Sequence, residues 1–267
     1  MRWFGRLFGG ACALLLASPA LCAEGPWQAF EGGRLRLVTL AMPDGGLQGG
    51  FQIDLEEGWK TYWRAPGGSG LPPQIDLSGS RNVASSAIRF PVPKTSRDPS
   101  GLTAVYDGDV TFPIDVTRLF TGRDVTLSAR GVIGVCREIC VPVPFATSVT
   151  HDAHGGTSFA VASDLAKARS GLPEPARAAL RVERARIDAD TLHVTARVPQ
   201  GAGAITLFPD GPANWYLAPA EPVSLTGGAA RFELPVPKNR VAGARGTSLR
   251  FLLKADGRGV TQSLAVE

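Results

Sequence analysis

Charged residues are scarce in this chain of 267 residues, of which only 19% are Asp, Glu, Lys or Arg. The formal net charge of +4 falls to about +2 if the N-terminal segment with Arg2 and Arg6 is removed. No stretch alternates Lys or Arg with aromatic residues, so nucleic-acid binding is excluded. Beyond the N-terminal segment no apolar run approaches the roughly 18 residues of a membrane-spanning helix, and we expect no stable membrane insertion.

Side chains suited to metal or redox chemistry are also few: three histidines, two methionines and four cysteines. What the chain does contain is 44% apolar residues, enough to bury a core, together with 32 glycines and 21 prolines. That turn-rich composition favours many short strands over long helices. The length allows one large domain or two ordinary ones.

Residues 1–23 have the pattern of an export signal peptide. A basic start is followed by the apolar stretch Leu7–Ala17 and then by Ser-Pro-Ala, just before a cleavage position near Cys22 or Ala23. The apolar stretch is too short to cross a bilayer. Leu21 is too large for the small residue that should precede a lipid-attached cysteine. We therefore expect an exported, soluble protein of the periplasm.

Short strand patterns follow one another through residues 27–152. Arg34–Thr39 alternates in the period of two that marks a half-buried strand, and turn signals such as Asp107-Gly108 separate the later runs. No long helix interrupts them, so we predict an antiparallel β-sandwich. Its expected strands are Arg34–Thr39, Leu47–Leu55, Trp59–Trp63, Ile88–Val92, Val105–Val116, Val125–Val135 and Val141–Thr150.

A helical linker is predicted at residues 153–175, with its helix at Thr157–Ser170. Ser158 can cap the start, Gly171 and Pro173 end it, and one face collects Phe159, Ala162, Leu165 and Ala166. Strand patterns then return, and we predict a second, smaller β-sandwich domain over residues 176–267. Its expected strands are Leu180–Ile187, Thr191–Val198, Ala204–Phe208, Val223–Leu225, Ala230–Val236 and Leu249–Ala255.

Only two cysteines, Cys136 and Cys140, lie outside the expected signal peptide. Two predicted strands flank them, so we expect a hairpin with both thiols at its exposed tip. Thiol–disulfide exchange requires a thiolate that a partner sulfur can approach. Arg137 would favour the thiolate and Glu138 would oppose it, so no unusually low thiol pKa is expected. This pattern favours a redox relay over a strong oxidant.

Two other uses of this cysteine pair stay open. A structural disulfide would close a five-residue ring and stabilise the fold by only about 2 kcal/mol. Paired thiolates also suit Cu(I) or Zn(II), but further ligands are remote: Met42 and the three histidines, His151, His154 and His193, lie elsewhere in the chain. His151 is expected roughly 35 Å along the strand from Cys140, which also argues against a Cys–His nucleophilic pair. We predict neither a metal set nor a cofactor.

Two longer motifs resemble a known family. Gly58–Pro73 (GWKTYWRAPGGSGLPP) and Val135–Pro142 (VCREICVP), with Phe90–Lys94 and Tyr106–Pro113 in the expected order, resemble the N-terminal periplasmic domain of DsbD-type thiol:disulfide interchange proteins. They are most similar to the branch that includes the copper-tolerance protein ScsB. The likeness covers most of residues 30–150, and it implies an immunoglobulin-like sandwich.

The resemblance also implies a function. The dithiol would take electrons from a membrane-embedded donor and pass them to oxidised periplasmic thioredoxin-like proteins, the chemistry behind cytochrome c biogenesis and copper tolerance. By the family's pattern Cys140 would form the mixed disulfide and Cys136 would resolve it. Tyr62 matches an aromatic position beside the family's active site.

The family covers its dithiol with a cap loop, which here corresponds to Lys94–Thr103. Within it Asp98 matches an acidic cap residue. The loop has no aromatic side chain, and Leu102 is its only bulky apolar substitute.

The chain departs from the enteric members of the family in two further ways. Three residues rather than five separate its cysteines. The family's membrane-spanning and C-terminal thioredoxin-like domains are not in this sequence, so we expect the electron donor to be a separate protein. The alternatives to this relay are a non-catalytic β-sandwich scaffold with a structural disulfide and a periplasmic copper-handling protein.

Overall fold

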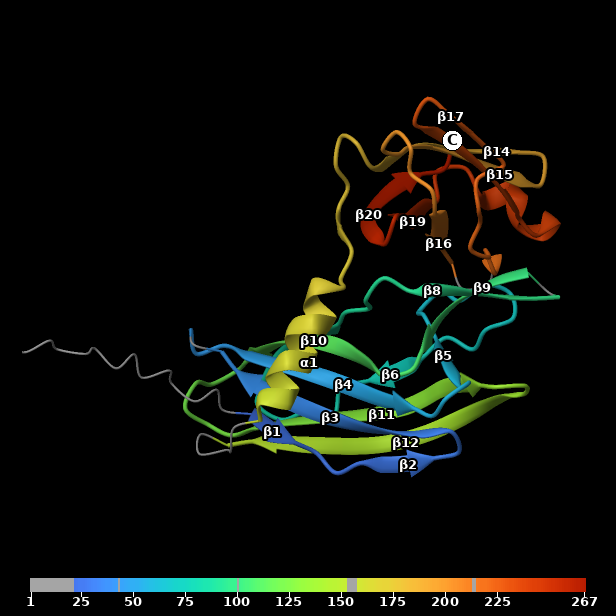
Figure 1. Ribbon diagram of the computed structural model, residues 1–267. Helices are drawn as coiled ribbons and strands as arrows, with labels where there is room; N and C mark the ends of the chain where they lie inside the picture. The colour runs from blue at the N-terminus through green and yellow to red at the C-terminus, as the bar shows by residue number, and fades with distance from the viewer. Residues whose placement is uncertain (1–21, 43, 100, 153–157, 213–214) are drawn as a thin grey trace, which may run out of the picture.

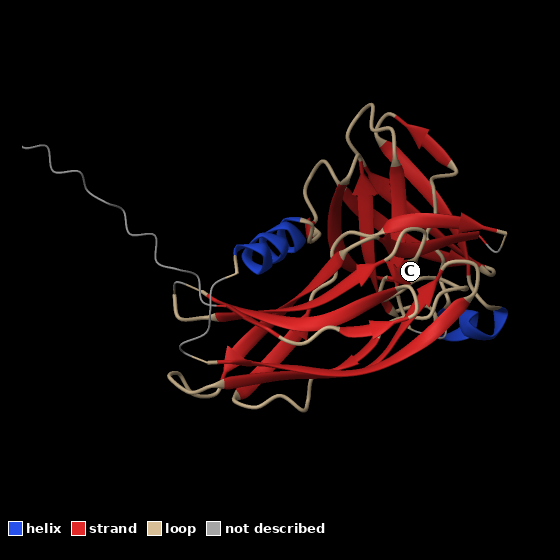
Figure 2. Ribbon diagram, turned by 60° about the horizontal axis from the view of Figure 1, so that its bottom comes forward, coloured by secondary structure: helices blue, strands red, loops and turns tan. Residues whose placement is uncertain are grey.

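The computed structural model describes residues 22–42, 44–99, 101–152, 158–212 and 215–267, and it is built almost entirely of β-strands (Figure 1; Figure 2). Most of the expected signal peptide and His154 lie outside the described residues. Two sandwiches follow one another along the chain, joined by a helix. The predicted fold class, an immunoglobulin-like antiparallel sandwich followed by a short helix and a smaller β-sandwich, is confirmed.

The first sandwich pairs two sheets. One has the order β1-β3-β4-β10-β7 with β2 beside β3, where the strands are β1 (Cys22–Glu24), β2 (Gln28–Phe30), β3 (Gly33–Ala41), β4 (Leu47–Leu55), β7 (Val83–Ile88) and β10 (Val110–Arg118). The other has the order β12-β11-β5-β9-β8 with β6 beside β11, where the strands are β5 (Lys60–Tyr62), β6 (Gln74–Asp76), β8 (Lys94–Asp98), β9 (Gly101–Asp107), β11 (Val125–Cys136) and β12 (Cys140–His151).

Apolar side chains from both sheets fill the space between them. Phe51 stacks on Phe112 at 6.4 Å between ring centroids and tilts against Phe145 at 5.0 Å. Phe51 and Phe112 are fully buried neighbours in one sheet, and the contact of Phe51 with Phe145 of β12 joins that sheet to the other. The strands that carry the cysteines therefore rest on a well-packed core.

Two predicted strands are wrong. The run Val105–Val116 is not one strand, because β9 ends at Asp107 and β10 begins at Val110. The run Ile88–Val92 was expected to be extended in the sheet, but β7 ends at Ile88. Pro91 and Pro93 follow, and neither has a backbone N–H to donate to a neighbouring strand. Val92 donates its N–H outside the sheet, to Gly171 O at 2.8 Å.

The helix α1 (Phe159–Ser170) begins after Ser158, whose side chain accepts a hydrogen bond from the Val161 N–H, as predicted. Its predicted apolar face is right only in part: Leu165 and Ala162 pack on the sheet, whereas Phe159 and Ala166 are exposed. The buried residues are Val161, Leu165 and Ala168, while Phe159 is 93% exposed. Residues three or four positions apart lie on the same side of a helix. Val161 and Leu165 on this side pack on Val38 and Leu40 of β3.

The helix therefore covers the outer face of the first sheet. Leu35 and Leu37 point into the sandwich core, and Val38 and Leu40 point to the helix, so β3 is buried on both faces. A β-carbon at Gly50 would lie 2.8 Å from Leu165 Cδ2; the glycine lets the helix approach the sheet closely.

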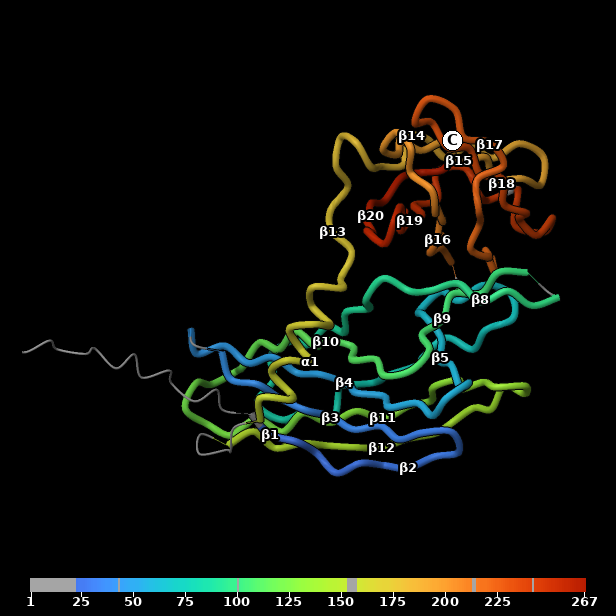
Figure 3. The backbone as a smooth tube through the Cα atoms, in the orientation of Figure 1, coloured from blue at the N-terminus to red at the C-terminus, as the bar shows by residue number. Residues whose placement is uncertain are grey.

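The second sandwich is reached by the chain rising from α1 through β13 (Figure 3). Its sheets have the orders β13-β20-β19-β16 and β14-β15-β18-β17. The strands are β13 (Glu174–Pro175), β14 (Arg181–Asp188), β15 (Thr191–Arg197), β16 (Ile205–Asp210), β17 (Ser224–Thr226), β18 (Ala229–Pro235), β19 (Ser248–Ala255) and β20 (Arg258–Ala265), with a short 3-10 helix at Lys238–Gly243. It has its own core, and in Figure 1 it lies beside β8 and β9.

Candidate dithiol site

The two cysteines close a long hairpin. β11 and β12 are paired without a register shift from Val125 opposite His151 to Cys136 opposite Cys140. The turn between them is Arg137-Glu138-Ile139, and Ile139 is 77% exposed. Because the ladder continues to the cysteines themselves, the sheet fixes the backbone of both residues. The expected hairpin with its thiols at the tip is present.

The two sulfur atoms differ in access. Cys136 is buried, with 6% of its surface exposed, whereas Cys140 is exposed. Both are free thiols, with their Sγ atoms 2.6 Å apart. A sulfur of another protein can therefore reach Cys140, and Cys136 stands directly behind it. This asymmetry is what a pair of attacking and resolving thiols requires.

Tyr62 contacts the exposed cysteine. Its phenolic oxygen lies 2.8 Å from Cys140 Sγ, and the side chain is 2% exposed. Burial, and then the hydrogen bond to Cys140, raise the pKa of Tyr62 far above its ordinary value. The phenol therefore stays protonated in the physiological range, so that it can donate its O–H to a thiolate at Cys140.

Two glycines leave room for the Tyr62 ring. A β-carbon at Gly134 would lie 2.8 Å from the ring and 2.8 Å from Leu71 Cβ. A β-carbon at Gly70 would lie 2.8 Å from the other edge of the ring, at Cδ1. The ring is thus held between close neighbours, which fixes the direction of its hydroxyl.

Lys60 is a site residue that the sequence reading missed. It is paired opposite Cys136 across β5 and β11, and its positive charge acts to lower the pKa of Cys136. Burial, and then the hydrogen bond between the two cysteines, raise the pKa of Cys136 overall; the hydrogen bond with Tyr62 and the charge of Lys60 oppose this rise. A signal was available: Lys60 and Tyr62 are two apart on a strand and so share a face.

The predicted cap loop, Lys94–Thr103, is a β-hairpin made of β8 and the start of β9. Ser96 of this hairpin accepts a hydrogen bond from Lys60 Nζ at 2.9 Å. The hairpin residue that clusters with Tyr62 and Cys136 is Val105, just beyond the predicted loop. The hairpin is therefore joined to the site through Lys60 and Val105.

The two predicted cap residues lie farther along this hairpin. Asp98 pairs with Gly101 at its end, and Leu102 pairs with Arg97. Leu102 is half-buried, and its carbonyl oxygen lies 3.4 Å from the position of a β-carbon at Gly67. A shielding role for Asp98 and Leu102 stays a prediction.

The charged residues of the turn, Arg137 and Glu138, are both exposed. The Arg137 side chain folds toward Gly58, where an added β-carbon would lie 3.4 Å from its Nε. The cation that acts on Cys136 is thus Lys60, on the neighbouring strand.

The two histidines that the structure describes, and Met42, lie away from Cys136 and Cys140. His151 is at the opposite end of β12, 5% exposed, with its Nδ1 3.3 Å from Thr39 Oγ1, and burial lowers its pKa. His193 is in the second sandwich, 3.6 Å from Glu233. Met42 packs against the cluster under α1. Within the described residues no three His, Cys, Asp or Glu side chains come together as a metal site.

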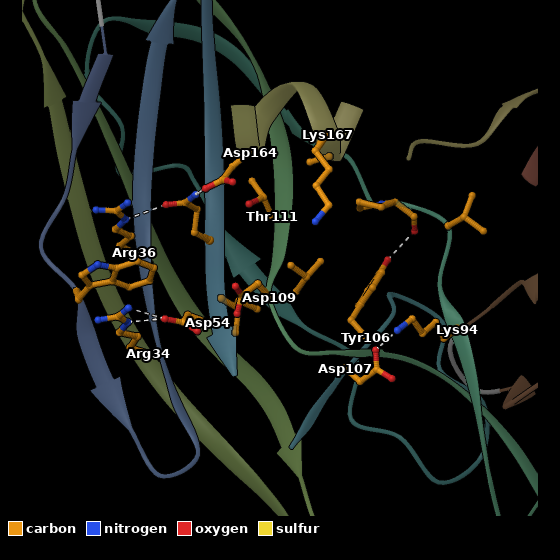
Figure 4. Close-up of a pocket in the computed structure, with 17 residues that line it drawn as sticks. Arg34, Arg36, Asp54, Lys94, Tyr106, Asp107, Asp109, Thr111, Asp164 and Lys167 are labelled. Carbon is orange, nitrogen blue, oxygen red and sulfur yellow. Dashed lines mark hydrogen bonds and ion pairs between the residues drawn. The ribbon is translucent and has the colours of Figure 1, made fainter. Parts of the chain in front are cut away.

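A separate groove lies on the outer face of the first sheet beside α1 (Figure 4). Its volume is about 720 Å³. Its charged groups largely bind one another: Arg34 pairs with Asp54 and Lys94 with Asp107, and Gln52 donates to Asp164. This groove contains no sulfur and is separate from the dithiol.

An immunoglobulin-like sandwich with an accessible dithiol at a hairpin tip defines a class of protein suited to thiol exchange. Residues 35–150 match the family model described as "Thiol:disulfide interchange protein DsbD, N-terminal". This part of the chain is therefore a DsbD-type N-terminal domain, and thiol-exchange partners in general follow from that family.

A solved structure extends the likeness over both sandwiches. The crystal structure of the N-terminal periplasmic domain of ScsB from Proteus mirabilis is similar with a TM-score of 0.73 and 19% identity, covering 91% of this chain and 98% of that one. At this identity the likeness concerns the fold. A biofilm-associated protein (BSP domain) aligns over 95% of this chain and 53% of its own, with 8% identity and a TM-score of only 0.24.

No curated protein matches this chain. In the portion of the chain that the structure describes, no helix is both long and apolar enough to cross a membrane.

Proposed function

We propose that this protein is a periplasmic relay of reducing equivalents. Its reduced Cys136/Cys140 dithiol would reduce an oxidised thioredoxin-like protein and would then be reduced again by a membrane-embedded thiol donor. The observation that carries the proposal is the exposed Cys140 sulfur with the buried Cys136 sulfur 2.6 Å behind it. The family match of residues 35–150 supports the same chemistry.

The exchange proceeds in two balanced steps. The Cys140 thiolate attacks one sulfur of the partner disulfide, forming a mixed disulfide, and the other partner sulfur leaves as a thiolate and takes up a proton. Cys136 then loses its proton and attacks Cys140 Sγ, which forms the Cys136–Cys140 disulfide and releases the second partner thiolate. Two electrons pass to the partner, which ends as a dithiol.

The surroundings of the two thiols support this division of roles. Burial of Cys136 keeps it from a protein-sized disulfide and raises its pKa, so it stays protonated until the mixed disulfide forms. The Tyr62 hydroxyl lies within hydrogen-bond distance of Cys140 Sγ and would donate to the thiolate that attacks the partner. Lys60 supplies a positive charge for the Cys136 thiolate in the second step.

The first test is the redox equilibrium of the dithiol with glutathione. A relay should be partly reduced within the glutathione range, whereas a structural bridge stays oxidised because its potential typically lies below about −300 mV. If the cysteine pair stays oxidised throughout that range, the relay proposal is wrong and the scaffold with a structural disulfide is favoured. Stoichiometric Cu(I) binding that is lost in Cys136→Ser would instead favour the copper-handling alternative.

The second test separates the roles of the two sulfurs. With an oxidised thioredoxin-fold protein as the probe, Cys136→Ser should accumulate a mixed disulfide through Cys140, because the resolving thiol is missing. Cys140→Ser should accumulate none. The reverse pattern on non-reducing gels would exchange the two roles.

A further inference from the structure

The second sandwich supplies part of the core of the first. Phe208 of β16 and Leu252 of β19 are paired across their strands, and both are buried. They belong to the hydrophobic cluster of the first sandwich, whereas Leu207, their neighbour on the other face, belongs to the second. The face of β16 and β19 that carries Phe208 is therefore built to pack against the dithiol domain.

This face contacts the residue that follows Tyr62. The Phe208 ring lies 5.9 Å from that of Trp63 in an edge-on arrangement, and Trp63 is 1% exposed. The next residue, Arg64, forms an ion pair of 2.8 Å with Asp210, two positions after Phe208 on the same face. Both charged side chains are mostly buried, at 28% and 23% exposure, so solvent screens this pair less than a surface one.

The loop after Arg64 continues between the second sandwich and the Tyr62 ring. At Gly67 a β-carbon would lie 3.1 Å from Ala218 Cα and 3.3 Å from Pro219. At Gly70 a β-carbon would lie 2.8 Å from Tyr62. One end of the loop thus rests on the second sandwich, and the other rests on the ring whose hydroxyl contacts Cys140.

The second sandwich also contacts the hairpin over the site. Glu221 pairs with Arg97 of β8 at 2.8 Å, and Lys254 Nζ donates to Pro93 O at 3.1 Å. The Arg97–Glu221 pair is exposed and contributes little energy by itself. It does tie the same hairpin whose Ser96 binds Lys60.

We propose that the second sandwich positions the dithiol chemistry of the first: through Phe208 and Asp210 it holds Trp63 and Arg64, and thereby holds the Tyr62 hydroxyl on Cys140. Phe208 and Asp210 are positioning residues, because they act on the sulfur only through Tyr62. The proposal deepens the relay function proposed above and assigns a role to a domain with no reactive group at the dithiol.

The test is a double-mutant cycle on the alkylation rate of Cys140 by iodoacetamide in the reduced full-length protein. Asp210→Asn should slow this reaction about threefold to tenfold, the loss expected when one hydrogen bond is misplaced. In the Tyr62→Phe background the same change should have no further effect, because the hydroxyl it positions is gone. Glu233→Gln, which neutralises a carboxylate paired with His193 elsewhere in the second sandwich, is the matched control and should leave the rate unchanged.

Phe208→Leu provides an independent variant that keeps apolar volume at the interface, and thermal unfolding of each variant checks that it is folded. An Asp210→Asn effect of equal size with and without the Tyr62 hydroxyl would overturn the proposal, since the domain would then act by general destabilisation. Unchanged rates in both Asp210→Asn and Phe208→Leu would overturn it too. Alkylation needs no redox partner, so this outcome is independent of the glutathione equilibrium that tests the relay.

Discussion

The phenolic oxygen of Tyr62 lies 2.8 Å from Cys140 Sγ, on a side chain that is itself 2% exposed. A buried phenol that stays protonated thus contacts the exposed thiol of the Cys136/Cys140 pair. This contact places a hydrogen-bond donor on the exposed thiol of the hairpin tip, as the proposed exchange requires.

Tyr62→Phe should slow the reaction of Cys140 with an aromatic disulfide about threefold to tenfold at neutral pH, because the thiolate loses a hydrogen-bond donor. Stopped-flow absorbance of the released aromatic thiol measures this rate. Tyr106→Phe is the control: its hydroxyl donates to Pro91 O at 2.7 Å, away from the sulfurs, so it should lose about 1 kcal/mol of stability and keep the rate. Equal rates in wild type and Tyr62→Phe would contradict the role of the hydroxyl.

Lys60→Met should slow the second step of exchange. The ammonium group favours the Cys136 thiolate, so its removal raises the pKa of Cys136 further and prolongs the mixed disulfide. Quenched-flow trapping of the mixed disulfide with a thioredoxin-fold probe gives its lifetime. Lys167→Met, on the exposed side of α1, removes the same charge far from the site. A lifetime that changes equally in both variants would rule out a local effect of Lys60.

The reduced protein should lose stability at alkaline pH. The pKa of Cys136 is raised in the folded state, so above the ordinary thiol pKa of about 8.5 the unfolded chain gives up this proton before the folded one does. The contribution of Cys136 to the free energy of unfolding is therefore fully present below that pH. It is lost as the pH rises toward the folded-state pKa of Cys136. Thermal unfolding of the reduced protein against pH should show the decline, and Cys136→Ser should show a smaller one. Equal declines in the wild type and in Cys136→Ser would contradict the prediction that Cys136 causes the loss of stability.

Gly134→Ala should disturb the site by crowding. The new β-carbon would stand 2.8 Å from both the Tyr62 ring and Leu71, and overpacking of this kind costs about 1–3 kcal/mol. We expect lower thermal stability together with slower reaction of Cys140. Gly68→Ala is the matched control, because nothing lies within 4 Å of its added β-carbon. Wild-type behaviour of Gly134→Ala would show that the ring can move without consequence.

The helix should depend on its buried stripe rather than on its aromatic residue. Leu165→Ala, at 1% exposure, should cost about 2–5 kcal/mol of stability, because it leaves a cavity against β3. Phe159→Ala, at 93% exposure, should cost almost nothing. Urea unfolding curves of the two variants make the comparison, and a larger loss for Phe159→Ala would contradict the packing described here.

Local sequence patterns predicted much of the secondary structure. The run Leu47–Leu55 was predicted as a strand with the full bounds of β4, and the two runs beside the cysteines predicted the hairpin. The reading failed where neighbours in space decide the outcome. Phe159 looks like a core residue in its helical pattern, but the sheet contacts Val161, which was not predicted, together with the predicted Leu165.

By itself the sequence determined that the chain is a β protein with two strand-rich halves, that its two remaining cysteines share a hairpin tip, and that its motifs resemble those of a DsbD-type domain. These features depend on the periodicity and spacing of residues along the chain, which can be recognised without knowing the tertiary contacts. Only the tertiary structure decided which sulfur is exposed, that Lys60 stands opposite Cys136, and that Phe208, 72 positions beyond Cys136 in the chain, packs beside the residue next to Tyr62. Such contacts join strands far apart in sequence, and side-chain packing selects them only when the sheets come together.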